Sequence, residues 1–389
     1  MMKNQNIEQY NEELKKIYEE EKDWLYTPEF SESGFVKRGA LSDFLYAYHD
    51  GEFSENGFML GFDSLAAYSI DRASCFLIIE NNKERFLEHF SLYAYYSYLT
   101  IHETSKACKC LRGVPYLEMQ RITNFFTSNI IARHWDKTQL IGKDLINSLN
   151  AEGCIIRRGD KNALQAWFVI ELFSLVFEVE INKKRALYPK DFSFYEKILE
   201  VWDSEDLVEI DKHVYNLCDL HLTKQGKDEE EELKFLEIPS LLLFPFEVLA
   251  WLRLREYKGF KNPREFTHPL MNEPITKTLL ELNEPLEEPN EVPFLNEFLS
   301  YVYEHCPDIP QDEKYIAQAN IVQQEAEQPK PTTAPKDAHY QATLPKNHPQ
   351  ANDLKKDPFA YQYYTKGKEF SYVGLEEYDL TQISWEIIK

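Results

Sequence analysis

The chain has 389 residues, with 43 Lys and Arg against 66 Asp and Glu, a formal net charge of −23 at pH 7. This excess of acidic residues argues against a protein that binds nucleic-acid phosphates directly, because such proteins bind through basic side chains. A hydrophobic share of 43% predicts a folded chain with a sizeable core, and only 13 glycines argue against glycine-rich phosphate loops and turn-dense β architectures.

The N-terminal region predicts an amphipathic helix over 4–24, because apolar side chains recur there at spacings of three and four residues. No apolar export segment is found at this end, so a cytoplasmic protein is expected. The most apolar windows, 166–177 and 241–254, are too short or too interrupted by charge for the roughly 20-residue span of a bilayer. The six cysteines are too sparse for a disulfide framework, and reduced thiols are expected.

The same periodicity predicts successive antiparallel helices over 58–80, 83–101, 115–133 and 135–149. Asn81-Asn82 and Gly113-Val114-Pro115 separate the first three. The stretch 153–160 breaks the series and is the expected boundary between an N-terminal region, 1–152, and a central helical domain, 153–322.

The central region contains two strongly apolar segments. The first, 163–181, predicts a buried helix with Glu171, Ser174 and Glu178 as a narrow polar stripe, although its second half alternates like a strand. The second, 241–255, ends before Gly259, which suits a left-handed helix cap.

Between these segments, 192–202 and 207–221 predict a helix pair, with Asp203 or Ser204 as the cap of the second helix.

The C-terminal part changes in composition. Between Thr278 and Glu313 the chain holds ten acidic residues and no Lys or Arg. Six prolines then predict a flexible linker over 323–358, and 359–389 form an aromatic segment that could fold back or bind a partner. The expected fold is all-α: antiparallel helix pairs stacked as a helical-repeat or bundle body, with the Pro-rich linker and the aromatic tail.

The best metal-binding candidate is the set His213, Cys218 and His221. Its spacing departs from zinc signatures and no fourth ligand is evident, so polar groups at a helix interface are the favoured interpretation. Cys108-Lys109-Cys110 has one intervening residue where zinc and redox motifs have two. We therefore expect neither a metal nor a cofactor.

No hydrolase motif is found, since a glycine-flanked nucleophile is missing and His102-Glu103 lacks a second histidine four residues later. Glu171 and Glu178 could perform acid–base catalysis if they were buried together, but a structural polar stripe is the favoured interpretation. Arg157-Arg158 is interpreted as a solvated loop in preference to a phosphate site. A protein without enzymatic activity is expected.

The acidic runs have two interpretations: a solvated surface, or a surface that steers a basic partner and speeds association by about one to three orders of magnitude. On the second, the acidic runs supply steering and the tail tyrosines supply buried anchors. The candidate partner-binding residues are Asp228, Glu229, Glu230, Glu231, Glu232, Glu281, Glu284, Glu287, Glu288, Glu291, Tyr361, Tyr363 and Tyr364.

The region from Tyr195 to Met271, about a fifth of the chain, contains the most recognisable strings. They are Tyr195–Asp206, Asn216–His221, Lys234–Leu236, Leu243–Arg255, Gly259 and His268–Leu270. This pattern resembles the α-helical immunity proteins encoded beside bacterial polymorphic toxins, most nearly immunity-protein family forty-nine. The resemblance implies a cytoplasmic protein of bacterial competition that binds and blocks a cognate toxin, such as one delivered by a type VI secretion system.

The expected function is thus stoichiometric neutralisation of a protein toxin, with a basic nuclease as a fitting partner, and no binding of nucleic acid or membrane. Three alternatives stay open: an enzyme that uses buried carboxylates, a scaffold or adaptor with several weak partners, and an acidic mimic of DNA.

Overall fold

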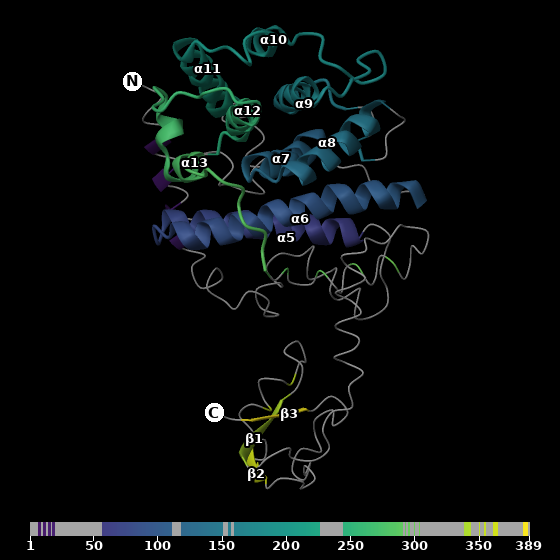
Figure 1. Ribbon diagram of the computed structural model, residues 1–389, viewed down its shortest axis with the longest axis vertical. Coiled ribbons are helices and arrows are strands. Elements are labelled where there is room, and N and C mark those ends of the chain that lie inside the picture. The colour runs from purple at the N-terminus through teal and green to yellow at the C-terminus, as the bar shows by residue number, and fades with distance from the viewer. Residues whose placement is uncertain are drawn as a thin grey trace. The chain divides into compact units, whose positions relative to one another are not determined.

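The computed structural model describes most of the chain between residues 57 and 290 and selected residues elsewhere (Figure 1). The described residues are 7–8, 11–12, 15–16, 18–19, 57–110, 118–150, 155–156, 159–225, 244–290, 292, 295, 299, 303, 338–343, 350, 354, 361–364 and 384–387. The chain divides into two compact units, Met1–Pro310 and Gln311–Lys389, which are considered separately. The predicted boundary at 152/153 lies inside the first unit.

The described elements of the first unit are helical, so the predicted helical class is confirmed there. Figure 1 shows α5 and α6 side by side in one layer, α7 and α8 in the next, and α9 to α12 beyond them. The helices are α5 (Gly57–Ile78), α6 (Lys83–Cys110), α7 (Met119–Ile131), α8 (Trp135–Asn150), α9 (Leu164–Phe177), α10 (Ser193–Leu199), α11 (Leu207–Gln225), α12 (Phe246–Tyr257), the 3-10 helix η2 (Pro269–Asn272) and α13 (Pro274–Leu280). Helical residues between 7 and 19 agree with the predicted N-terminal helix, and Ile7 and Tyr18 on it are buried.

Helix α12 lies at the centre of this unit and packs against α7, α9 and α11. All ten residues from Phe246 to Arg255 are buried, which confirms the buried segment expected there. Two of them are arginines, Arg253 and Arg255. A buried guanidinium needs hydrogen-bond acceptors all round it, so these two side chains determine which loops lie against the ends of α12.

The end of α12 confirms the sequence prediction for Gly259. This glycine has a φ of +87°, its N–H donates to the Glu256 carbonyl, and the Phe260 N–H donates to the Arg255 carbonyl. These two hydrogen bonds form a Schellman motif, in which a left-handed residue satisfies the last carbonyls of a helix.

The start of α11 and the end of α9 differ from the prediction. Asp206, not Asp203 or Ser204, caps α11, and its carboxylate accepts hydrogen bonds from the N–H groups of Val208 and Glu209. Helix α9 ends at Phe177, because Glu178 takes a left-handed conformation with a φ of 56°. The alternating residues that follow form no strand in the described part of the chain.

The second unit contains a three-stranded antiparallel sheet in the order β2-β1-β3. The strands are β1 (Ala338–Thr343), β2 (Tyr361–Tyr364) and β3 (Ser384–Ile387). Ala338 pairs with Tyr364, and Tyr340 pairs with Ile387. This sheet was not predicted: β1 lies in the segment expected as a linker, and β2 and β3 lie in the aromatic segment.

Gly142 in α8 allows α9 to approach closely. A Cβ atom at this position would lie 2.4 Å from the Phe173 ring. We expect Gly142→Ala to lower the free energy of unfolding by about 1–3 kcal/mol, because the clash outweighs the gain of about 1 kcal/mol in helix propensity. Urea denaturation followed by circular dichroism measures this change. Phe173→Leu in the Gly142→Ala background should make the alanine less costly than in the parent, and a stabilised single variant would contradict the packing argument.

Candidate partner-binding surface

An acidic extended segment, residues 281–290, follows α13 and is called the acidic strap below. Its backbone is fixed to the helical body at Leu286, whose N–H donates to the Ala132 carbonyl at 2.9 Å. The Leu286 carbonyl lies 2.7 Å from His134 Nε2, and the Ser91 hydroxyl donates to the Glu287 carbonyl at 2.6 Å. These bonds satisfy backbone groups that a loop would otherwise leave to water.

His134 can hold the strap as a neutral donor. Burial lowers the pKa of His134, and the hydrogen bond to the Leu286 carbonyl opposes this shift. Because a carbonyl oxygen only accepts, Nε2 carries the proton in this contact. The neutral ring therefore suffices for the contact near pH 7.

The strap carries four of the predicted partner-binding carboxylates, and the structure divides them into two pairs. Glu281 forms an ion pair with Lys83 at 2.8 Å, and Glu288 forms one with Lys137. Glu284 and Glu287 are exposed, and no ion pair to either is found within the described part of the chain. The net negative field of the strap therefore comes mainly from Glu284 and Glu287.

The other predicted partner-binding residues are less defined. Asp228–Glu232 and Glu291 lie outside the described residues. Tyr361, Tyr363 and Tyr364 lie on strand β2, and their side chains are outside the described part. The tail tyrosines therefore stay a prediction.

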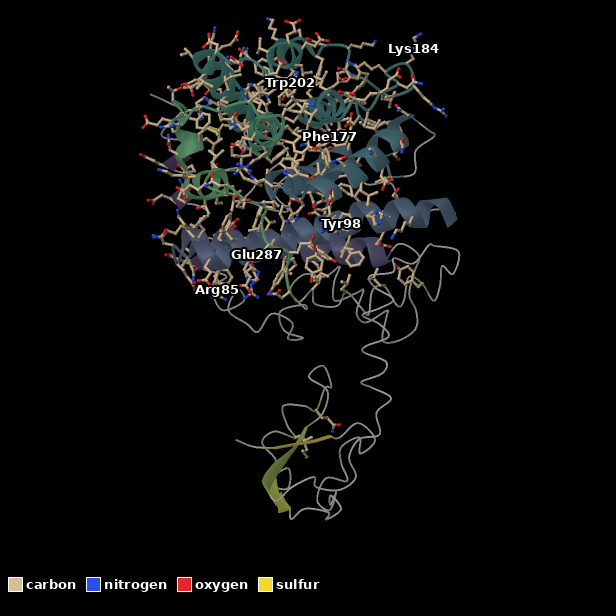
Figure 2. The ribbon with its side chains drawn as sticks, viewed as in Figure 1. Arg85, Tyr98, Phe177, Lys184, Trp202 and Glu287 are labelled. Atoms are coloured by element: carbon tan, nitrogen blue, oxygen red, sulfur yellow. The ribbon has the colours of Figure 1, made fainter. Side chains whose placement is uncertain are left out.

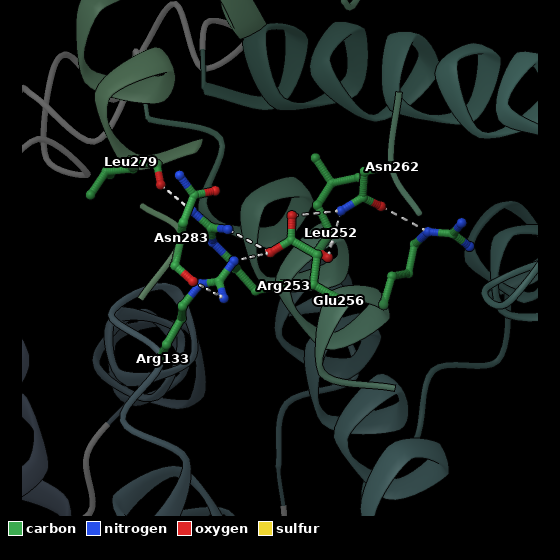
Figure 3. Close-up of polar contacts among 8 residues, drawn as sticks. Arg133, Leu252, Arg253, Glu256, Asn262, Leu279 and Asn283 are labelled. Carbon is green, nitrogen blue, oxygen red and sulfur yellow. Dashed lines mark hydrogen bonds and ion pairs between the residues drawn. The ribbon is translucent and has the colours of Figure 1, made fainter. Parts of the chain in front are cut away.

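The strap is linked to α12 through a network of arginines around Glu256 (Figure 3). The Glu256 carboxylate accepts from Arg133 and from Arg253, each at 2.5 Å, and Asn262 donates to its other oxygen at 3.0 Å. Arg133 also donates to the Asn283 carbonyl at 2.9 Å, and Arg253 donates to the Leu279 carbonyl. Arg253 thus connects Glu256 with the end of α13, and Arg133 connects it with the start of the strap.

Three aromatic side chains lie beside this network and are called the aromatic cluster: Trp135, Phe177 and Tyr257. The Tyr257 ring centroid lies 4.6 Å from that of Trp135 and 5.0 Å from that of Phe177. Trp135 and Phe177 are half-buried, and Tyr257 is 39% exposed. Phe177 of the cluster and Glu287 of the strap are both labelled in Figure 2.

The first turn of α8 joins the cluster to the strap. Trp135 belongs to the cluster, and Lys137 two residues later pairs with Glu288. Glu256, which binds Arg133, directly precedes Tyr257. No local sequence pattern predicts the cluster, because its members come from three helices that are far apart in the chain.

Two of the three metal-ligand candidates, His221 and Cys218, are buried side chains of the core. His221 Nδ1 lies 3.0 Å from Glu247 Oε1, and Gln165 donates to the same oxygen at 2.8 Å. His221 and Glu247 are fully buried, so the histidine acts as a partner for a core carboxylate. Burial raises the pKa of Cys218 well above its usual value, which disfavours the thiolate that a metal needs. Within the described residues no group of three or more His, Cys, Asp or Glu could hold a metal.

The candidate catalytic carboxylates are not brought together. Glu171 is buried and forms an ion pair with Lys183 at 2.6 Å, whereas Glu178 is exposed at the end of α9. A buried carboxylate pair, on which the acid–base alternative depended, is therefore not formed by these two residues. Among the other candidates, Glu103 is buried and accepts from Lys106 at 3.0 Å. Arg157-Arg158 and the side chains of Cys108 and Cys110 lie outside the described residues.

Of the helices in the described part of the chain, none is both long and apolar enough to cross a membrane. Comparisons with protein-family models, with curated proteins and with solved structures give no match.

The Glu256 network allows a direct test of what holds the strap in place. We expect Glu256→Gln to lower the free energy of unfolding by about 2–4 kcal/mol, because it leaves the buried Arg253 without an anion. Backbone amides of the strap should also exchange faster, which hydrogen–deuterium exchange measures. Glu200→Gln, at an exposed site on the end of α10, is the matched control and should change stability by less than about 0.5 kcal/mol. Equal effects of the two substitutions would contradict the role of Glu256.

Proposed function

We propose that this protein is an immunity protein that binds a basic protein toxin through the acidic strap and the aromatic cluster and thereby neutralises it. The observation that carries the proposal is that the strap, with its exposed Glu284 and Glu287, and the half-exposed aromatic cluster both adjoin the α7–α8 turn, the strap through Ala132 and Arg133 and the cluster through Trp135. In protein interfaces, charges at the rim speed the encounter and aromatic residues at the centre supply most of the affinity. The net charge of −23 supports a partner of the opposite sign.

The strap suits a binding role because its backbone is already ordered. Hydrogen bonds through Asn283, Leu286 and Glu287 hold it on the helical body. Binding to a segment that is already ordered loses less conformational entropy, so more of the contact energy contributes to affinity. The proposed site of action is the cytoplasm, and the proposed toxin class is a basic nuclease, such as an effector of a type VI secretion system.

We favour binding over catalysis because the buried carboxylates Glu171 and Glu247 have structural partners. Glu171 is paired with Lys183, and Glu247 accepts from His221 and Gln165 inside the core. Such contacts are typical of ion pairs and polar networks that stabilise a fold. In contrast, two carboxylates of the acidic strap, Glu284 and Glu287, form no ion pair with a described residue.

The decisive experiment is co-expression with the product of the adjacent open reading frame, followed by toxicity and binding assays. The proposal expects that the neighbour is toxic alone, that this chain restores growth, and that the two form a stoichiometric complex. A neighbour with no toxic activity, or a toxic one that this chain neither binds nor neutralises, would contradict the proposal.

Charge reversal on the strap should slow complex formation. We expect the double variant Glu284→Lys/Glu287→Lys to reduce the association rate constant about 10-fold at low salt, with a smaller effect at high salt, because screening weakens steering. Surface plasmon resonance with the toxin measures both. Glu200→Lys is the single-charge control on α10, and it should change the rate less than either Glu284→Lys or Glu287→Lys alone. Equal single-variant rates would mean that the strap has no special role.

Truncation of the aromatic cluster should instead speed dissociation. We expect Trp135→Ala and Tyr257→Ala each to raise the dissociation rate constant at least 10-fold, which corresponds to about 1.4 kcal/mol or more. The association rate should change little. Phe194→Ala removes another surface ring, 38% exposed on α10, and serves as the matched control. A Phe194→Ala effect as large as that of the cluster variants would refute the cluster as the anchor.

A further inference from the structure

His134 lies where the α7–α8 turn meets the middle of the acidic strap. Its Nε2 is 2.7 Å from the Leu286 carbonyl oxygen, and the Leu286 N–H donates to the Ala132 carbonyl at 2.9 Å. The turn therefore holds Leu286 through both its N–H and its carbonyl. Of the described bonds to the strap, only the one from His134 has a donor group that ordinarily changes its charge between about pH 5 and pH 8.

The other ring nitrogen of His134 is buried without a partner. His134 is 8% exposed, and no hydrogen bond to its Nδ1 is found within the described part of the chain. In the neutral ring that donates through Nε2, Nδ1 carries no proton. Protonation would add an N–H donor at Nδ1 and a positive charge on the ring, and a buried donor without an acceptor is costly away from water.

The charges near His134 do not offset this cost. The charged side chains that act on the ring are Lys137 on α8, which disfavours the protonated ring, and Glu288 on the strap, which favours it. These two form an ion pair with each other, so their effects on the ring oppose one another. The preceding residue in the turn, Arg133, is paired with Glu256.

Helix α6 brings uncharged groups to the same place. The rings of Tyr95 and Tyr98 have their centroids 5.4 and 5.5 Å from Lys137 Nζ, and tyrosine is ordinarily neutral below about pH 9. Burial therefore has the largest effect and lowers the pKa of His134, while the hydrogen bond to the Leu286 carbonyl opposes this shift. The attached strap thus favours the neutral ring.

We propose that His134 makes the attachment of the acidic strap sensitive to pH, so that mild acid frees the segment around Leu286 from the helical body. In the released state water would satisfy both ring N–H groups, whereas in the attached state one of them would be buried without an acceptor. The attachment is at full strength above the ordinary histidine pKa of about 6.5 and weakens as the pH falls below it. Release is a property of this chain alone, and its effect on a partner rests on the proposed function.

The test is hydrogen exchange of the full-length chain at about pH 7.5 and about pH 5.5, with protection factors corrected for the intrinsic effect of pH. We expect protection of the Leu286 amide to fall about 5- to 10-fold, because one proton can shift the equilibrium at most about 10-fold at one pH unit below 6.5. Amides of α12 should keep their protection. Unchanged protection at Leu286, or an equal loss in α12, would overturn the inference. No partner is present, so failure here is distinct from failure of the proposed function.

Variants assign the change to His134. His134→Gln keeps an N–H donor for the Leu286 carbonyl but does not titrate, so protection of its strap should be equal at both pH values. His213→Gln, at a half-buried histidine on α11, is the matched control and should keep the parent's pH dependence. Glu288→Gln should also keep it, and loss of the dependence in this variant would assign the effect to the ion pair with Lys137 and refute the inference. If His134→Gln does not fold, NMR titration of the His134 ring in the parent decides, because its midpoint must lie below pH 6.5 and coincide with the change in strap exchange.

Discussion

The Glu256 carboxylate joins segments of the helical body that are far apart in the chain. It lies at the end of α12, and it accepts from Arg133 in the α7–α8 turn, from Arg253 within α12 and from Asn262 in the following loop. Because Arg253 is 1% exposed, its charge is tolerated only with an anion and a carbonyl close by. Two guanidiniums thus share one carboxylate, and they in turn donate to the carbonyls of Leu279 and Asn283.

Arg255 performs a related task with neutral acceptors only. It donates to the carbonyls of Trp202, Ser204 and Lys261 and to the side chain of Asn262. Its acceptors lie on the loop before α11 and the loop after α12, whereas those of Arg253 lie at Glu256 and at the end of α13. The two arginines can therefore lie in a helix that is buried along its length, because each finds its hydrogen-bond acceptors there. They connect the core to loops on different sides of the helix.

Much of the helical body was predictable from local sequence, whereas features that depend on contacts between distant residues were not. Helices α5 to α8 follow from the periodicity of apolar residues, α9 follows from a segment that is apolar nearly all round, and the left-handed Gly259 follows from the backbone freedom of glycine. Asp206 was missed as the cap of α11 because three neighbouring polar residues offer similar local chemistry. The sheet of the second unit was missed because its strands are short and pair across about 20 to 45 residues, and composition alone suggested a linker. Of the candidate surface, the acidic residues were predictable, whereas the aromatic cluster and the Glu256 network depend on helices that meet only in the folded chain.

The way in which the acidic strap is attached also bears on how such a surface can diverge. The bonds that fix Asn283, Leu286 and Glu287 use their backbone atoms, so they do not depend on which side chains the strap carries. Substitutions at exposed positions such as Glu284 and Glu287 therefore change the surface without loosening its support. A lineage can exchange exposed residues on the strap one at a time while the scaffold beneath stays intact, which separates the evolution of this surface from that of stability.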